Sequence, residues 1–222
     1  MGSLILIFGP PGSGKGTQGD LLAEGLGLKK IATGDIFRRH VSEGTDLGKQ
    51  VESIINSGNL VSDEILAKLV ESELNSNKDE AVLLDGYPRT LVQAQDLKGM
   101  EAFQRIEKVL YLDVSDKLVS ERMVGRRICS SCAYVYNISA GSTKKENICD
   151  RCEGTLVARE DDAAEKVAAR LQIYKEKTLP LLEFFSDHGF LERINGEASP
   201  EEVFLEISNK LSGIKKREVK NS

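Results

Sequence analysis

The sequence predicts an α/β protein built on a doubly wound parallel sheet. Short apolar runs alternate along the chain with longer stretches whose apolar residues recur at helical spacing, as expected when helices connect parallel strands. Gly9, Asp85 and Asp113 directly follow three of the apolar runs. Ligands of such sheets bind beyond the carboxyl ends of the strands, so these residues lie where we expect a functional site.

Four apolar runs are predicted as strands. The first, Leu-Ile-Leu-Ile-Phe at residues 4–8, is continuously apolar and ends at Gly-Pro-Pro-Gly, which predicts a buried parallel strand followed by a turn. The other predicted strands lie at residues 81–84, 109–112 and 190–194.

The stretches between these strands are predicted as helices. Apolar residues at helical spacing follow Gly16 and recur at residues 63–74, 91–97 and 160–185. We expect Pro180 to kink or split the last of these stretches, because proline lacks the amide hydrogen that a helix interior needs.

Composition restricts the partners of the chain. Its 222 residues carry a formal net charge of -5, which argues against a nucleic-acid partner, because affinity for a phosphate backbone needs clustered positive charge. No stretch approaches the roughly 18 apolar residues that a membrane span needs, and no export segment is visible. We therefore expect a cytoplasmic protein without a membrane partner, in which any bound anion is small and locally held.

Residues 9–17, Gly-Pro-Pro-Gly-Ser-Gly-Lys-Gly-Thr, follow a predicted strand and open a predicted helix, which is the context of a phosphate-binding loop. Gly9, Gly12 and Gly14 allow positive φ angles, so that backbone N–H groups can approach phosphate oxygens, and Lys15 adds a positive charge. A hydroxyl residue often follows the lysine directly, whereas here Gly16 takes that place and Thr17 comes next.

Four cysteines, all that the chain has, lie within residues 126–158, a stretch of short polar turns that we predict to be an inserted β module. They form two Cys-x-x-Cys pairs, a spacing that can present four thiolates tetrahedrally to one metal: Cys129, Cys132, Cys149 and Cys152. Two disulfides are the alternative, but a reducing cytosol favours thiolates on a metal. Four protein ligands predict a structural site for zinc, although cobalt or iron would fit the same ligands.

Four motifs in order along the chain carry a family resemblance. They are Gly-Lys-Gly-Thr at 14–17, Ala-Thr-Gly-Asp at 32–35 followed by Arg38, Asp-Gly-Tyr-Pro-Arg-Thr at 85–90 with Gln93, and Arg-Met-Val-Gly-Arg-Arg at 122–127. Together with Arg-Glu-Asp-Asp at 159–162 and Arg170, they make the chain similar to adenylate kinases of the long-lid form along nearly its whole length.

The resemblance implies a P-loop NTPase-type core with a small helical insertion and a small β lid that binds the metal. The core would comprise residues 1–31, 62–124 and 163–222, the AMP-binding domain residues 32–61, and the lid residues 125–162. It implies reversible transfer of a phosphoryl group between ATP and AMP, with ADP as product and Mg²⁺ held with ATP, in a monomeric enzyme that maintains the adenine nucleotide pool.

The resemblance also implies which residues hold each nucleotide. The ATP set is Gly12, Ser13, Gly14, Lys15, Gly16, Thr17, Arg122, Arg126, Val135, Tyr136 and, through its main chain, Ala198, where the family often has lysine. The AMP set is Thr33, Arg38, Asn59, Leu60, Val61, Gly86, Tyr87, Pro88, Arg89, Gln93, Arg159 and Arg170.

The chemistry of the residues agrees with those roles. The phosphate of AMP is already an ionised nucleophile, so positioning and positive charge must provide the catalysis. The candidate catalytic cations are Lys15, Arg38, Arg89, Arg122, Arg126, Arg159 and Arg170, because guanidinium groups bind phosphate bidentately and stay charged. Each arginine alone could be a surface ion-pair partner. We expect Asp85 to hold Mg²⁺ through water rather than to cap a helix, and Asp35 to assist it.

Two other functions would use part of this set. A kinase with GTP as donor, or with another nucleoside monophosphate as acceptor, would share the phosphate loop and the arginines. Thr33 and Gln93 favour AMP as acceptor, because a carboxamide offers both a donor and an acceptor to a base edge. A P-loop switch or a metal-ribbon binding module would need no second nucleotide site, and the second set of arginines argues against it.

Overall fold

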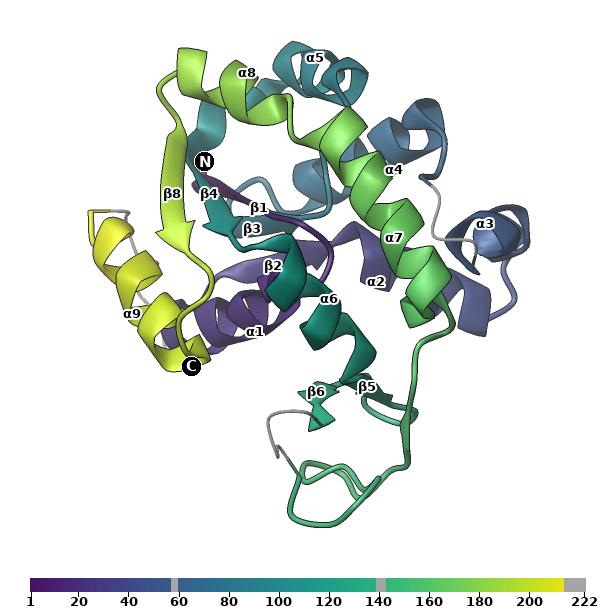
Figure 1. Ribbon diagram of the computed structural model, residues 1–222. Helices are drawn as coiled ribbons and strands as arrows, with labels where there is room; N and C mark the ends of the chain where they lie inside the picture. Colours follow the sequence, from purple (N-terminus) through teal and green to yellow (C-terminus); the bar gives the residue numbers. More distant parts are fainter. Residues whose placement is uncertain (57–59, 139–142, 214–222) are drawn as a thin grey trace, which may run out of the picture.

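The computed structural model describes residues 1–56, 60–138 and 143–213 (Figure 1). Its centre is a parallel sheet with the strand order β2-β3-β1-β4-β8, which confirms the predicted fold class. The strands are β1 (Leu4–Phe8), β2 (Lys29–Ala32), β3 (Val82–Asp85), β4 (Ile106–Asp113) and β8 (Leu191–Asn195).

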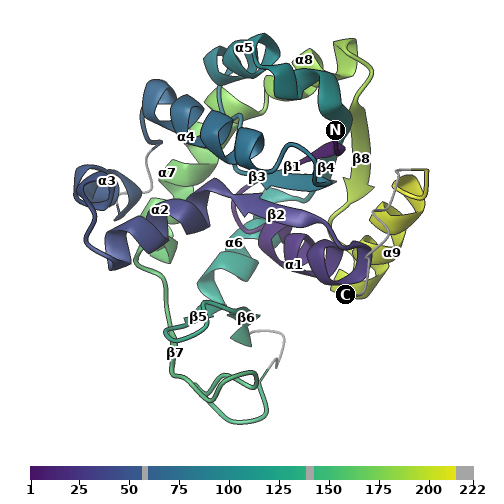
Figure 2. The same cartoon turned by 180° about the vertical axis from the view of Figure 1, so that it is seen from behind.

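Helices connect the strands and cover both faces of the sheet (Figures 1 and 2). The α-helices are α1 (Lys15–Leu26), α2 (Thr33–Ser42), α3 (Asp46–Asn56), α4 (Asp63–Ser76), α5 (Leu91–Gly99), α6 (Asp116–Val124), α7 (Ala164–Ile173), α8 (Leu181–Asp187) and α9 (Pro200–Lys210). Shorter turns are the 3-10 helices η1 (Glu101–Arg105) and η3 (Glu160–Asp162) and the π-helix η4 (Tyr174–Thr178).

The central strand β1 is buried on both faces, as its continuous apolar run predicts. Alternate side chains of a strand point to opposite faces. Leu4, Leu6 and Phe8 accordingly belong to the core cluster that includes α4, α5 and α8, whereas Ile5 and Ile7 belong to the cluster that includes α1 and α9. The strand is thereby held between two apolar layers, and the loop that follows it starts from a rigid base.

Three local features differ from the sequence prediction. The first helix begins at Lys15, directly after Gly14 in a left-handed conformation, and not after Gly16. The stretch 160–185 is broken at Pro180, as predicted, but also by the turn η3 and the π-helix η4. Strand β2 was not predicted, because its sequence Lys-Lys-Ile-Ala is half polar and its pairing with β3 is what makes it a strand.

The strand order creates the crevice. The chain pairs β1 with β3 on one side and with β4 on the other, so the connections leave the carboxyl end of β1 open between them. A separate antiparallel sheet, β6-β5-β7, follows α6 and confirms the predicted β module. Its strands are β5 (Arg126–Cys129), β6 (Val135–Asn137) and β7 (Leu156–Val157). None of the described helices is long and apolar enough to cross a membrane.

Candidate active site

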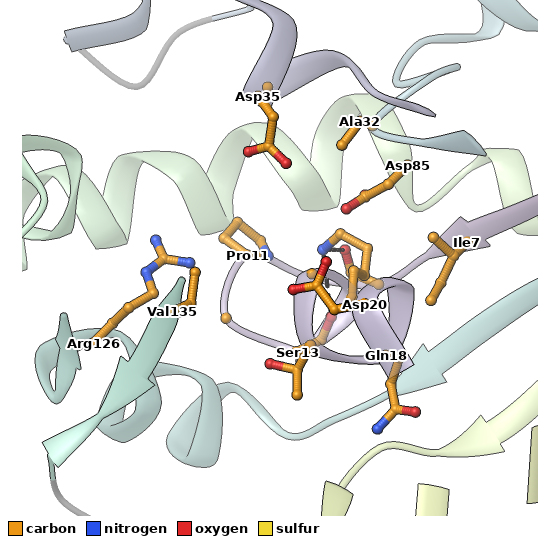
Figure 3. A pocket seen from close by; sticks show the side chains of 18 of the residues that line it. Ile7, Pro11, Ser13, Gln18, Asp20, Ala32, Asp35, Asp85, Arg126 and Val135 are labelled. Carbon is orange, nitrogen blue, oxygen red and sulfur yellow. Dashed lines mark hydrogen bonds between the residues drawn. The ribbon is translucent and has the colours of Figure 1, made fainter. Parts of the chain in front are cut away.

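A cavity of about 1010 Å³ opens at the carboxyl ends of β1 and β3 (Figure 3). Its lining comes from the glycine loop, the start of α2, residues 85–89, the β module, α7 and residues 196–200. Pockets for one small ligand usually measure about 300–1,000 Å³. The cavity therefore lies at the upper end of that range, and segments from the whole length of the chain form its walls.

The glycine loop has the backbone that its sequence predicts. Gly9, Gly12 and Gly14 have φ angles of 151°, 79° and 96°. A Cβ atom on Gly12 would lie 2.7 Å from Cγ of Met123, so the loop is also too closely packed for a side chain there. The Lys15 ammonium donates to the carbonyl oxygens of Gly9 at 2.8 Å and of Pro10 at 2.9 Å, which folds the lysine back over the loop.

The electrostatic environment of Lys15 is unfavourable to its charge. The pKa of Lys15 is lowered to about 8, chiefly because the lysine is withdrawn from water; the carboxylate of Asp85 opposes this shift, while the nearby guanidinium groups of Arg89, Arg170 and Arg126 contribute to it. Positive charge is thus concentrated where few anions balance it. An incoming phosphate would relieve this repulsion.

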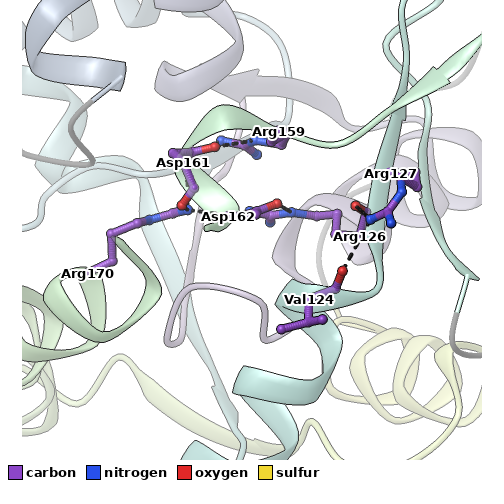
Figure 4. A network of polar contacts seen from close by, with 7 residues as sticks. All are labelled: Val124, Arg126, Arg127, Arg159, Asp161, Asp162 and Arg170. Atoms are coloured by element: carbon purple, nitrogen blue, oxygen red, sulfur yellow. Dashed lines mark hydrogen bonds and ion pairs between the residues drawn. The ribbon is translucent and has the colours of Figure 1, made fainter. Parts of the chain in front are cut away.

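Three arginines from separate elements meet at the side of the cavity (Figure 4). Arg126 of β5 forms a bidentate pair with Asp162, with Nε 2.6 Å from Oδ2. Arg159 binds both oxygens of Asp161 at 2.9 and 2.6 Å. Arg170 of α7 bridges the two carboxylates, at 2.9 Å from Asp161 and 3.2 Å from Asp162. Three guanidinium groups face two carboxylates, so the network keeps one positive charge.

The charges of this network help to explain the shifted pKa values of Arg159 and Asp161. The pKa of Arg159 is lowered to about 10, chiefly by burial and also by the positive charges of Arg126 and Arg38, while Asp161 opposes the shift. Burial alone would raise the pKa of Asp161, but the guanidinium groups of Arg159 and Arg170 hold it below its usual range. From the sequence alone, Asp161 and Asp162 were recognised only as part of the motif at residues 159–162. Their position beside Arg159 was the available signal that they fix the arginines.

A second group of residues surrounds the end of β3. Arg89 donates from Nε to the Gly86 carbonyl at 2.8 Å, and Arg38 pairs with Asp35 on α2. Thr33 donates to the Gly86 carbonyl at 3.1 Å. The amide of Gln93 accepts from the Arg89 backbone and donates to Asp63, both at 2.6 Å. These bonds connect the helical segment after β2 with the loop after β3.

The cavity brings together most of the predicted residues. All the residues of the predicted ATP set line it, and so does Asp85. From the predicted AMP set, the lining residues are Arg38, Leu60, Gly86, Pro88, Arg89, Arg159 and Arg170. Four others are buried and do not line the cavity: Thr33, Val61, Tyr87 and Gln93. Asn59 lies outside the described residues.

Comparison with known proteins identifies the family. The family model described as adenylate kinase matches residues 7–190, most of the chain. The chain belongs to the adenylate kinase family. It is 42% identical over 216 residues to the adenylate kinase of Fervidobacterium nodosum, covering 96% of this chain and 99% of that protein. It is also 42% identical over 214 residues to that of Anaeromyxobacter dehalogenans (95% and 99% covered), and 40% identical over 210 residues to that of Clostridium botulinum (92% and 96%).

Membership of the adenylate kinase family makes the chain a nucleoside monophosphate kinase, that is, a phosphotransferase. The arrangement of the cavity suits this chemistry. A glycine loop with its lysine faces two further sets of arginines, so that two phosphate chains could meet between them.

The four cysteines of the β module converge on one point. Their sulfur atoms all lie within 4.8 Å of one another, with Cys129 and Cys152 at 3.4 Å and Cys132 and Cys149 at 3.6 Å. Four thiolates around a metal at about 2.3 Å would be about 3.8 Å apart, so the cluster fits a tetrahedral ion. The two pairs also share a backbone form, because the residue after each pair has a positive φ of 58°. The cluster can therefore hold a metal.

Tyr136 supports this cluster. Its side chain is buried in the β module, its hydroxyl lies 3.4 Å from the Cys149 sulfur, and that hydroxyl accepts from the Asp150 backbone at 2.9 Å. Since the ring packs among the cysteines, any contact that Tyr136 makes with a nucleotide would come from the parts of the residue that face the cavity.

Proposed function

We propose that the chain catalyses reversible phosphoryl transfer between ATP and AMP, with ADP as the product. The observation that carries this proposal is that one cavity holds a phosphate-binding loop and a second set of arginines outside that loop. A protein that binds a single nucleotide would need only the first. In this proposal the second set of arginines binds the phosphate of the acceptor nucleotide.

In this proposal the donor phosphates lie on the glycine loop and at the start of α1, whose N–H groups and dipole favour anions. Lys15, Arg122 and Arg126 neutralise them, and the main chain near Ala198 and the Val135–Tyr136 segment contact the donor base and ribose. Asp85 lines the cavity beside Lys15. Its carboxylate is a ligand type that Mg²⁺ prefers, so Asp85 fits the role of holding Mg²⁺ with ATP, where the ion would neutralise phosphate charge.

The acceptor side in this proposal comprises the residues around α2 and the end of β3. Arg38, Arg89, Arg159 and Arg170 hold the AMP phosphate, and Thr33 and Gln93 select adenine. Gln93 now uses its amide for Asp63 and for the backbone of Arg89. Reading a base would therefore require Gln93 to exchange at least one of these partners.

Catalysis then follows from charge and position. The AMP phosphate oxygen attacks the γ-phosphorus, the bond from that phosphorus to the β,γ-bridging oxygen breaks, and ADP leaves from the donor side. Negative charge spreads over the oxygens of the transferred group, where Lys15 and the guanidinium groups stabilise it. AMP is already ionised, so no histidine base is needed.

We further propose the domain division that the sequence suggested. Residues 32–61 and 125–162 would be mobile units on a core formed by residues 1–31, 62–124 and 163–222. Closure of both units would exclude water, which otherwise competes with AMP for the phosphoryl group. The cysteine cluster would hold structural zinc and keep the lid, residues 125–162, in one shape. The resemblance also supports a monomer.

The test is an assay of donor and acceptor pairs. Purified protein is supplied with Mg²⁺ and ATP plus AMP, CMP, UMP or GMP, then with GTP as donor, and the diphosphates are quantified. We expect ATP with AMP to react fastest. A faster reaction with GTP would make the enzyme a GTP-dependent AMP kinase, and failure of every pair would refute the kinase proposal.

A further inference from the structure

The segment between β8 and α9, residues 195–200, forms one wall of the cavity and is held at several points. The Gly196 backbone donates to the Asp113 carbonyl at 3.0 Å. A Cβ on Gly196 would lie 2.5 Å from Val114, so the backbone sits tightly against the end of β4. The Ser115 backbone also donates to the Glu197 carboxylate at 2.9 Å. The segment is thus anchored where it leaves the sheet.

The carbonyl groups of this segment are nearly all in use. Arg122 donates to the carbonyls of Gly196 at 2.8 Å and Glu197 at 3.5 Å, and the Ser199 carbonyl accepts the Val203 backbone in α9. The Pro200 carbonyl accepts from Nε2 of Gln18 at 2.9 Å. Ala198 lines the cavity, and within the described chain its carbonyl accepts no hydrogen bond. Among the backbone carbonyls of residues 196–200, the Ala198 carbonyl is therefore the one left to accept a hydrogen bond from a ligand.

Gln18 makes its bond across 182 residues of sequence, from α1 to the first residue of α9. In Figure 3 its side chain leaves α1 on the side away from Asp35 and Asp85. It is 3% exposed, and within the described residues its Oε1 is buried without a partner. Leaving a buried acceptor unpaired is unfavourable.

That unpaired oxygen indicates a specific use for the amide. A methionine of similar length would fill the same space between α1 and α9 without burying an unpaired acceptor. Natural proteins break the rule that buried polar atoms are hydrogen-bonded mainly at functional sites, where a contribution to function offsets the lost stability. The gain here is the single bond to Pro200, which fixes the far end of the segment while Arg122 fixes the near end.

We propose that Gln18 is a positioning residue that sets the enzyme's preference for the donor base. By holding Pro200, it keeps the intervening Ala198 carbonyl in place as a fixed acceptor in the donor part of the cavity. This inference rests on the proposed function, in which the donor base lies against this segment. Gln18 acts through the segment and needs no contact with the nucleotide.

The chemistry of the two purine bases predicts which donor a fixed carbonyl favours. Adenine carries an amino group at position 6, which donates to a carbonyl, whereas guanine carries an oxygen there, which a carbonyl repels. A rigid acceptor therefore favours ATP over GTP. An acceptor that can shift loses the bond to adenine and also relaxes the repulsion of guanine.

The experiment compares wild type with Gln18→Met and Gln18→Glu. Both substitutions remove the amide donor, and the carboxylate of the second also repels the Pro200 carbonyl. The matched control is Ser208→Ala on α9. This substitution removes a hydroxyl whose oxygen is also buried without a hydrogen-bond partner in the described residues, and it leaves residues 196–200 unchanged. For each protein we measure kcat and KM with ATP and with GTP at saturating AMP, the KM for AMP, calorimetric binding of ATP and of GTP alone, and thermal unfolding.

We expect Gln18→Met to lower the ratio of kcat/KM for ATP to that for GTP by about fivefold, the size of one hydrogen bond. The change should lie mainly in the KM for ATP, with the KM for AMP unchanged, and Gln18→Glu should show a larger effect. The control should keep the wild-type ratio. An unchanged ratio, an equal loss with both donors, or a lower melting temperature with unchanged preference would overturn the inference.

The two proposals can fail separately. If wild type phosphorylates no acceptor, the proposed function fails, and the calorimetric preference for ATP over GTP still tests Gln18. If either variant does not fold, the other variant provides the same comparison. If wild type is active and both variants keep its base preference, the inference alone fails.

Discussion

The depressed pKa of Lys15 makes a quantitative prediction about pH. Its ammonium must be protonated to attract the donor phosphates, and in the nucleotide-free protein its pKa is about 8. The dependence of kcat/KM on pH reports groups of the free enzyme. We therefore expect kcat/KM for ATP to fall on the alkaline side, with a midpoint near pH 8.

The size of the effect follows from the same value. About nine-tenths of Lys15 is protonated at pH 7 but only about one-tenth at pH 9, so kcat/KM should fall roughly tenfold for each pH unit above 8. Bound phosphates raise the pKa of a neighbouring cation. The profile of kcat, which reports the complex, should consequently stay flat to a higher pH.

The assay is steady-state kinetics between pH 6.5 and 10 with Mg²⁺ and AMP held saturating. The comparison variant is Lys15→Arg, whose guanidinium stays charged throughout this range. The plateau of kcat/KM should be lower for this variant, because an arginine fits the loop less well. Its kcat/KM should not fall near pH 8. A wild-type profile that is flat to pH 9.5, or a limb that persists in Lys15→Arg, would refute the assignment.

Stability should change with pH in the opposite direction to activity. Lys15 has a pKa of about 8 in the folded chain and 10.5 in the unfolded one, so between these values the unfolded chain binds more protons and the contribution of Lys15 to stability rises with pH. Below pH 8 the charged lysine destabilises the fold by on the order of 3 kcal/mol. In urea titrations, the stability advantage of Lys15→Met at pH 7 should shrink toward pH 10.5, and a constant difference would contradict the linkage.

Three further outcomes are expected. Removing the metal with a chelator should lower the melting temperature and make residues 125–162 more susceptible to proteolysis, whereas an unchanged melting curve after verified metal loss would exclude a structural role. Arg89→Ala should lower kcat/KM at least about a hundredfold, on the order of 3 kcal/mol, with an unchanged circular dichroism spectrum, and near-normal turnover would show that its role is misassigned. Arg105 is 8% exposed and donates to the carbonyls of Gly2, Leu74, Asn77 and Glu80. Arg105→Ala should therefore reduce the free energy of unfolding by about 3 kcal/mol and the melting temperature by about 6–12 °C, with Arg105→Lys intermediate and activity at low temperature retained.

Local patterns were enough to predict the phosphate loop and the cysteine cluster. The glycine loop is encoded within nine residues between a strand and a helix, and its positive φ angles follow from glycine itself. The cysteine spacing likewise predicts two similar turns, and each pair is followed by a residue with the same positive φ. Such features depend on neighbours in sequence, so they can be predicted without knowing the fold.

Other features depend on partners that are distant in sequence. Strand β2 exists because β3 offers a neighbour, not because Lys-Lys-Ile-Ala is a strong strand sequence. The helical pattern of 160–185 did not reveal the π-helix η4, because apolar spacing reports which face is buried and not which backbone bond is made. The bond from Gln18 to Pro200 could not be predicted from either residue's surroundings in the sequence.

The sequence by itself determined the kind of chemistry: a phosphate loop, a set of arginines, and four thiolates, each recognisable from residue type and spacing. Only the tertiary structure decided that Arg126, Arg159 and Arg170, which line the same cavity as Lys15, share two carboxylates and keep a net positive charge. The physical reason is the distance along the chain between the groups that interact. Backbone conformation is set by adjacent residues, whereas a pKa, an ion pair or a cavity is set by whichever groups folding brings within a few ångströms.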